Sequence, residues 1–356
     1  MFKQCEKYFR AHCHVLVVLV LLSILGTAVS IVSPYITGNI ITDISSGHSL
    51  FPILHKCKVL LLLFLLSHAM GVFSSVLKLK IELSMGKEFN CDVIFHIQDL
   101  PYSYIQSQNL SALNQAVNQD TNTIIAFCID LVLTVTTKIL NVLCILFLCF
   151  SLNIEMSLII VISSILYTLL YLVLKKKLYA TRKNLRICES NFFAKLFEQL
   201  EFIYFIKTNS IESSFRKRVD DSFAKFTSAK VNDSYLQYLI SVLQSSISLL
   251  SQLILLIVGA QCVYNDKITI GLLITFSTYF SQVQNGILYF LNLGSSYQNA
   301  RVSSQRIHDI LSKSKEPSGH KKFSLPLSVS CKNLSFTFSD ENRFLYENVS
   351  FSLQPG

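Results

Sequence analysis

The feature that most constrains this chain is a series of apolar runs too long for a soluble core. Residues 15–32 carry no charge, and 51% of the whole chain is hydrophobic. Only 15% is charged, against about 25% in a soluble domain. A bilayer core about 30 Å thick is crossed by about 20 helical residues, whose backbone polar groups bond within the segment. These runs therefore predict membrane helices.

Six membrane spans are predicted along the chain. Basic residues before the first run, Lys3, Lys7 and Arg10, also fit a secretory signal. The run is longer than a typical signal core and further apolar segments follow, which favours an uncleaved helix. The last two stretches exceed one membrane thickness, so we expect tilted helices or helices that continue into water. The segments are 15–32, 59–77, roughly 135–153, 156–174, 234–265 and 268–300.

The distribution of lysine and arginine predicts the orientation of the chain. The N-terminal arm, residues 78–120, residues 175–235 and the tail from Gly294 hold 27 of the 31 basic residues. Because basic residues favour the cytoplasmic side, we expect both termini in the cytoplasm and short outer loops.

Both long inner connections carry apolar residues at helical spacing, such as Phe192, Leu196 and Phe197. We therefore expect the spans to continue as long helices into the cytoplasm, turn and return. Two small soluble subdomains are the alternative. The predicted fold class is all-α membrane, with six transmembrane helices extended into the cytoplasm.

The tail has a different character from the rest of the chain. Residues 312–326 include Pro317 and Gly319, which is linker composition. Residues 327–338 and 345–353 alternate apolar and polar positions around a polar turn, a pattern typical of a β-hairpin. We divide the chain into a six-helix domain over 1–311, a linker over 312–326 and the opening of a second domain over 327–356.

Taken together, these segments resemble a type I ATP-binding-cassette (ABC) exporter. Residues 328–338 and 345–356 are similar to the opening of that family's nucleotide-binding domain, whose body would be an α/β ATPase, so the hairpin here is incomplete. The resemblance implies that Phe338 stacks on adenine, where tyrosine is more usual. It also implies ATP and Mg²⁺ as cofactors. The sequence contains no GxxxxGK[ST] phosphate loop, so we expect no ATP hydrolysis by this chain alone.

Two stretches resemble the family's coupling regions, which contact the ATPase. The first contains Tyr102, Ser103 and Tyr104 after a Leu-Pro pair, without the usual glycine in the turn that follows. The second contains Ile203, Ile206 and Lys207, with Phe202 replacing a common glycine. The family works as a homodimer or as a heterodimer of homologous half-transporters. The implied partners are such a subunit, membrane lipid and a transported substrate, but no nucleic acid.

Polar residues inside the spans are candidates for a substrate cavity, because such residues are costly in lipid. The candidate lining residues share helix faces in the last two spans, and their alternative role is hydrogen bonding between helices. We expect Lys138 to reach the inner interface. We expect His68 to be a packing residue. The candidates are Gln244, Ser248 and Gln252 in the fifth span and Gln282, Asn285 and Tyr289 in the sixth.

The substrate class stays open among a peptide, a lipid-linked molecule and a drug-like amphiphile. No Cys/His peptidase segment precedes the first span, so we do not expect a self-contained exporter that cleaves leader peptides. A membrane scaffold without transport is the alternative function. An ion-driven transporter is disfavoured because no predicted span has a central carboxylate. The ten cysteines show no metal-type spacing, and we expect no metal site.

Overall fold

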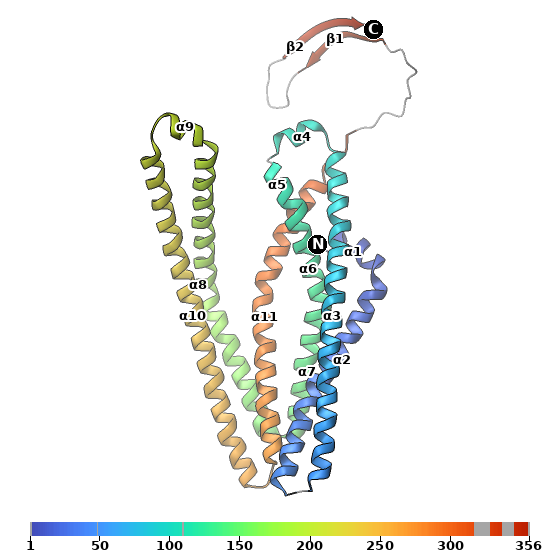
Figure 1. The fold of residues 1–356 in the computed structure, drawn as a ribbon, viewed down its shortest axis with the longest axis vertical. Helices are drawn as coiled ribbons and strands as arrows, with labels where there is room; N and C mark the ends of the chain where they lie inside the picture. The colour runs from blue at the N-terminus through green and yellow to red at the C-terminus, as the bar shows by residue number, and fades with distance from the viewer. Residues whose placement is uncertain (1, 48, 109, 317–327, 337–344, 355–356) are drawn as a thin grey trace.

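The computed structural model describes residues 2–47, 49–108, 110–316, 328–336 and 345–354, which form a long helical bundle and a small hairpin (Figure 1). The elements are α1 (Phe2–Ala11), α2 (Cys13–Ser45), α3 (Leu50–Gln98), α4 (Tyr102–Ser107), α5 (Leu110–Gln115), η1 (Ala116–Asp120), α6 (Thr121–Asp130), η2 (Leu131–Val135), α7 (Thr136–Leu152), α8 (Ile154–Glu201), α9 (Ile203–Thr208), α10 (Glu212–Tyr264), α11 (Ile270–Leu311), β1 (Val329–Phe336) and β2 (Tyr346–Leu353).

Each predicted span is the apolar part of a longer helix. The helix α3 has 49 residues and α10 has 53, whereas about 20 residues cross a bilayer core. Within the residues that the structure describes, five helical stretches are long and apolar enough to cross a membrane: α2, α3, Leu113–Leu152, α8 and α10. The helix α11 is long enough, but Gln282, Gln284 and Asn285 dilute its apolar residues. The membrane-bundle class is therefore confirmed, and the count of six stays a prediction.

The bundle has two different ends (Figure 1). At one end, which we call the short-loop end, α2, α7 and α10 turn directly into the next helix. Side chains cap two of these turns: Asn153 Oδ1 accepts from the N–H of Met156 at 3.1 Å, and Thr269 Oγ1 accepts from that of Leu272 at 3.3 Å. At the other end, the tip end, the short helices α4 and α9 join the long ones.

The helices α2 and α11 meet backbone to backbone near the short-loop end. A Cβ placed on Gly271 would collide with the backbone oxygen of Gly38, and a Cβ on Gly38 would meet Gly271 in the same way. Small residues let two helices approach this closely inside a membrane. Thr275 adds a hydrogen bond, with its Oγ1 donating to the backbone oxygen of Pro34 at 3.1 Å.

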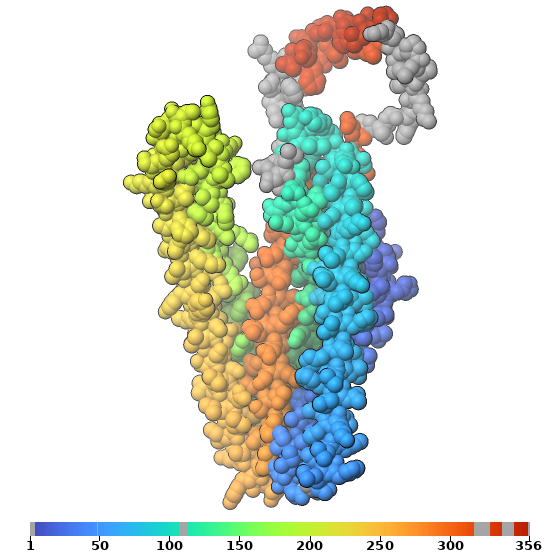
Figure 2. Space-filling model, in the orientation of Figure 1, coloured from blue at the N-terminus to red at the C-terminus, as the bar shows by residue number. Residues whose placement is uncertain are grey.

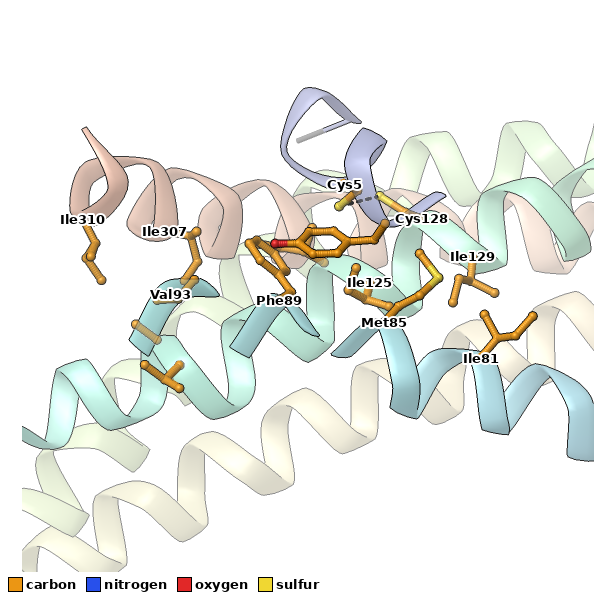
Figure 3. Close-up of a cluster of buried hydrophobic side chains, with 14 of the residues drawn as sticks. Cys5, Ile81, Met85, Phe89, Val93, Ile125, Cys128, Ile129, Ile307 and Ile310 are labelled. Atoms are coloured by element: carbon orange, nitrogen blue, oxygen red, sulfur yellow. Dashed lines mark hydrogen bonds between the residues drawn. The ribbon is translucent and has the colours of Figure 1, made fainter. Parts of the chain in front are cut away.

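A first core cluster fixes the N-terminal helix against the bundle. Figure 3 shows Cys5 of α1 beside Met85 and Phe89 of α3 and Cys128 of α6, and all four are buried. At the edge of this core, the hydroxyl of Tyr8, itself a member of the cluster, and Lys7 Nζ donate to Asp92 Oδ2 at 2.6 and 2.7 Å. Burial raises the pKa of Tyr8, and the bond to Asp92 raises it further. The helix α1 is thus held by packing and by a polar contact.

A second core cluster surrounds α11 nearer the short-loop end. Phe276, Tyr279 and Phe280 are buried there against Ile145 of α7 and Met156 of α8. The helix α11 also contacts α2, α3, α6 and α10. It is therefore the internal helix of the bundle, where its polar side chains can bond to neighbouring helices.

The helices α8 and α10 separate from the other helices toward the tip end (Figures 1 and 2). Their shared buried cluster is small, comprising Leu178, Leu236 and Ile240. Farther along, the rings of Phe192 and Phe226 stack with centroids 5.6 Å apart. This pair of helices, with α9 between them, forms an arm that is joined to the bundle mainly at its short-loop half.

The two strands pair antiparallel, with Val329 opposite Leu353 and Phe336 opposite Tyr346. The predicted hairpin is therefore confirmed as a two-stranded sheet. Its apolar side chains are exposed, and two strands alone are marginal in water. Phe338 lies outside the described residues.

The glycine contact between α2 and α11 can be tested with one substitution at two positions. We expect Gly271→Ala to destabilise the chain by about 1–3 kcal/mol, because the added methyl group forces two backbones apart. Gly71→Ala is the control, since nothing lies within 4 Å of a Cβ there. It should be neutral or slightly stabilising. Thermal unfolding followed by a thiol-reactive dye measures both, and equal midpoints for the two variants would contradict the contact.

Candidate coupling tips and a polar membrane recess

The first tip, α4, presents Tyr102 to solvent. Leu100 is buried, which anchors the chain as α3 ends, and Pro101 in an extended conformation begins the short helix. Tyr102 is 74% exposed. Ser103 and Tyr104 belong to the same helix. The three predicted residues of the first coupling region therefore lie together at the tip end.

The segment that leaves α11 is tied to this first tip. Lys315 Nζ lies 2.8 Å from Asp99 Oδ2, and the backbone N–H of Glu316 donates to the Asp99 carbonyl oxygen at 2.7 Å. Lys313 Nζ lies 5.8 Å from the centroid of the Tyr104 ring, within the range of a cation–π contact. The connection toward the hairpin is thus attached to the α3–α4 corner.

The second tip, α9, contains Ile203, Ile206 and Lys207. Ile206 is buried and holds the short helix against the arm, while Ile203 is exposed. Ser210 adopts a positive φ of 51° as the chain turns into α10. The most exposed large hydrophobic side chain of this helix, at 80%, is Tyr204. The sequence analysis did not select it, although an aromatic run between charged residues was a usable signal.

A polar recess lies between α2, α7 and α11, within the membrane part of the bundle. Its volume is about 380 Å³, within the range of small-ligand sites. Two of the six predicted cavity residues, Gln282 and Asn285, line it. The lining residues are Ser23, Gly26, Thr27, Ser30, Thr137, Lys138, Asn141, Gln282 and Asn285.

The other predicted cavity residues lie elsewhere. Gln244 is buried and Ser248 partly buried on α10. Gln252 Nε2 donates to Ser277 Oγ on α11 at 3.1 Å. The Tyr289 hydroxyl donates to Asp130 Oδ2 at 2.6 Å. Two of these four therefore bond across helix contacts.

Gln282 also donates a hydrogen bond to a backbone carbonyl that loses its usual donor because of a proline. Pro34 has no N–H, so the carbonyl of Ser30, four residues earlier, lacks its usual donor within α2. Gln282 Nε2 donates to this oxygen at 3.1 Å. The Tyr279 hydroxyl, on the same face of α11, donates to the backbone oxygen of Ile31 at 2.7 Å. Gln282 therefore combines both roles considered for it, bonding α2 and lining the recess.

The sequence analysis missed the contribution of α2 to the recess. Ser23, Thr27 and Ser30 line it at spacings i, i+4 and i+7, which places them on one helix face. That spacing was visible in an otherwise apolar run. Asn141 of α7 joins them, because its Nδ2 donates to Ser30 Oγ at 3.2 Å. His68, by contrast, lies on the exposed face of α3, with its ring 4.1 Å from that of Phe64.

The described residues offer no site for the implied cofactors. No group of three or more His, Cys, Asp or Glu side chains among them could hold a metal ion. The adenine contact expected of Phe338 falls outside them. What these residues can do is bind a ligand between helices and present two tips to another domain.

Residues 16–287 match the family model of the ABC transporter transmembrane region. The chain therefore belongs to this family and is a multi-pass membrane protein.

Among curated proteins, it is 23% identical over 253 residues to the lactococcin transport/processing ATP-binding protein LcnC-like of Lactococcus lactis, covering 68% of this chain and 34% of the relative. It is 25% identical over 277 residues to the cyclolysin secretion/processing ATP-binding protein CyaB of Bordetella pertussis, covering 76% and 38%. The multidrug resistance-like ATP-binding protein MdlB of Buchnera aphidicola is 24% identical over 336 residues, covering 91% and 57%. The chain thus spans between a third and three fifths of the length of these relatives.

The hydrogen bond from Gln282 to the Ser30 carbonyl can be tested by a double-mutant cycle. Gln282→Leu should cost about 1–3 kcal/mol, because it leaves the Ser30 oxygen unpaired in a low-dielectric site. Pro34→Ala restores an N–H to α2, so Gln282→Leu should cost about 1 kcal/mol less in that background. Thermal unfolding of the four proteins gives the coupling energy. Gln252→Leu is the control, because it removes a bond to α11 and none to α2. Its effect on the free energy of unfolding should add to that of Pro34→Ala. If the effects of Gln282→Leu and Pro34→Ala also add, the bond between Gln282 and the Ser30 carbonyl is contradicted.

Proposed function

We propose that this chain is the membrane domain of an ATP-driven exporter that moves its substrate outward by alternating access. The observation that carries this proposal is the pair of short helices, α4 and α9, at the same end of long helical hairpins. Each presents an exposed tyrosine, Tyr102 or Tyr204. Such tips give an ATPase domain a contact whose energy differs between the two membrane states, which is what a shift of equilibrium requires.

The proposal places the tip end and both termini in the cytoplasm. The two connections that contain the tips, the N-terminal arm and the tail hold 27 of the 31 lysines and arginines. The positive-inside tendency of membrane proteins supports this orientation. The long helices α3, α8 and α10 would then extend beyond the bilayer on the cytoplasmic side.

We infer six crossings, with α11 as the sixth. Its moderate hydropathy is compatible with a span, because two of its central polar residues, Gln282 and Gln284, bond to neighbouring helices. Gln282 donates to α2, and Gln284 Nε2 donates to Ser163 Oγ of α8 at 3.3 Å. A helix whose polar groups are bonded inside the bundle does not expose them to hydrocarbon.

The proposed working form is a dimer. The arm formed by α8, α9 and α10 stands apart from the bundle at the tip end (Figure 2). Phe193, Phe197 and Tyr238 on this arm are 56%, 66% and 72% exposed. Exposed aromatic side chains along an arm favour an interaction with another chain. A second copy or a homologous half-transporter would supply it.

ATP and Mg²⁺ would act in the nucleotide-binding domain that residues 327–356 begin, after the linker 312–326. Phe338 would stack on adenine there. In this chain, Tyr102, Ser103, Tyr104, Ile203, Ile206 and Lys207 would transmit the state of that domain. The contacts of Lys313 and Lys315 with the α4 corner support a direct link between the linker and the first tip.

A peptide is the substrate class that the comparisons support best. Two of the relatives are named for lactococcin transport and cyclolysin secretion. A third is named for multidrug resistance, so a lipid-linked or drug-like substrate is the second candidate. A membrane scaffold without transport is the alternative function, and it gives no role to two tips at one end.

The orientation can be tested with two cysteine variants of equally exposed tyrosines. Tyr204 is 80% exposed at the tip end, and Tyr264 is 89% exposed at the short-loop end. In intact cells, a membrane-impermeant maleimide should label Tyr264→Cys but not Tyr204→Cys, above the level of the parent chain. Lysis should make both react. Labelling of Tyr204→Cys in intact cells would overturn the cytoplasmic placement.

The coupling role can be tested by transport. In inside-out vesicles that contain the chain and its ATPase domain, ATP should drive uptake of a fluorescent random-peptide library. Tyr204→Ala should reduce this uptake by about tenfold or more, as expected for an aromatic interface anchor. Tyr264→Ala, at the opposite end, should transport like the parent. Uptake unaffected by Tyr204→Ala would contradict the coupling role, and a parent without ATP-dependent uptake would contradict peptide export.

A further inference from the structure

The polar recess contains one charge, and it belongs to Lys138. The other eight lining residues are serine, threonine, glycine, asparagine and glutamine. Among the residues that the structure describes, no carboxylate forms an ion pair with Lys138 Nζ. The recess therefore presents a cation without a counter-ion.

The nearest acidic residue along the helix already has partners. Asp130, two turns before Lys138, accepts from the Tyr289 hydroxyl at 2.6 Å, and its Oδ1 lies 3.4 Å from Lys78 Nζ. These contacts join α3, α6 and α11 and neutralise the carboxylate. Asp130 is therefore paired with Tyr289 and Lys78. It does not compensate the charge of Lys138.

Lys138 is the third residue of α7 and lies inside the predicted span 135–153, near its inner end. It precedes the end of α7 at Leu152 by 14 residues, which corresponds to about 21 Å at 1.5 Å per residue. An unpaired cation at membrane depth is costly, and such residues usually belong to a substrate or ion pathway. Reaching the interface, which we expected from the sequence, is an alternative for a free lysine. In the structure, Lys138 lines the recess together with Asn141 and Gln282.

We propose that the recess binds the carboxylate of a transported peptide, with Lys138 as its counter-ion. Asn285, which is exposed and lines the same recess, offers an amide beside it. A charge-assisted hydrogen bond to a carboxylate supplies the missing negative charge. This inference rests on the proposed export function, because the ligand is taken to be the cargo, and it names the group by which the cargo is recognised.

The experiment compares two probes that differ only in charge. N-dansyl-Leu-Leu-Phe with a free carboxylate and its C-terminal amide are titrated against the full chain in phosphatidylcholine nanodiscs, without nucleotide. Dansyl fluorescence measures binding. We expect the acid to bind about tenfold more tightly than the amide, as for one hydrogen bond to a charged group. Equal affinities for the two probes would overturn the proposal.

Three variants assign the preference to Lys138. Lys138→Gln should remove it and leave binding of the amide unchanged, whereas Lys138→Arg should retain it. Lys175→Gln, at an exposed position on α8, is the control for general loss of charge and should retain the preference. A preference that survives Lys138→Gln would overturn the assignment. Retention in Lys138→Arg shows that the charge, and not the fold, is responsible.

Lipid head groups also carry negative charge and are a second candidate ligand of Lys138, which the experiment must distinguish from the peptide carboxylate. Adding phosphatidylglycerol to the nanodiscs should leave the acid preference in place. Its loss would assign the recess to lipid and overturn recognition of cargo. Because binding is measured without ATP, failure of transport leaves this result intact. Conversely, ATP-driven uptake that ignores the carboxylate refutes only the role of Lys138.

Discussion

The contact between α2 and α11 is the interaction on which the rest of the bundle depends. Two glycines let the backbones come into contact. A proline in α2 leaves one backbone carbonyl without a donor in its own helix, and a glutamine of α11 donates to that carbonyl. Thr275 and Tyr279 add donors along the same line. Polar groups in lipid must find partners within the protein. This pairing therefore selects one register of α11 against α2 and turns polar side chains of α11 into the bundle.

With α11 at the centre, the other helices divide into two groups. The helices α2, α3, α6 and α7 remain around it, and α1 packs against this group through the cluster in Figure 3. The helices α8 and α10 contact α11 near the short-loop end and then diverge as an arm. The arm has a small buried cluster of its own, and the dimer proposed above would cover its exposed side chains.

The recess and the first tip, α4, are connected through α11, which offers a physical route between them. Gln282 lines the recess, Tyr289 bonds Asp130 two turns farther along α11, and the segment after α11 is tied to the α4 corner. A shift of α11 would therefore change both the recess and the first tip. A ligand that favours one position of this helix would bias the tips by its difference in affinity between the two positions.

The apolar runs alone determined the membrane class, and the period-two alternation determined the hairpin, because both patterns depend on local spacing. The resemblance around Tyr102 and Ile203 predicted where to look for the tips. Sequence could not determine which polar faces meet, since Gln252 and Gln282 have the same chemistry and equally plausible spacing. Only tertiary packing decided that Gln252 bonds a serine on α11 and that Gln282 bonds the unpaired carbonyl of Ser30 beside the recess. Among the described residues, it also left Lys138 without a carboxylate partner, because Asp130 contacts Lys78 and Tyr289, which lie far away in the chain.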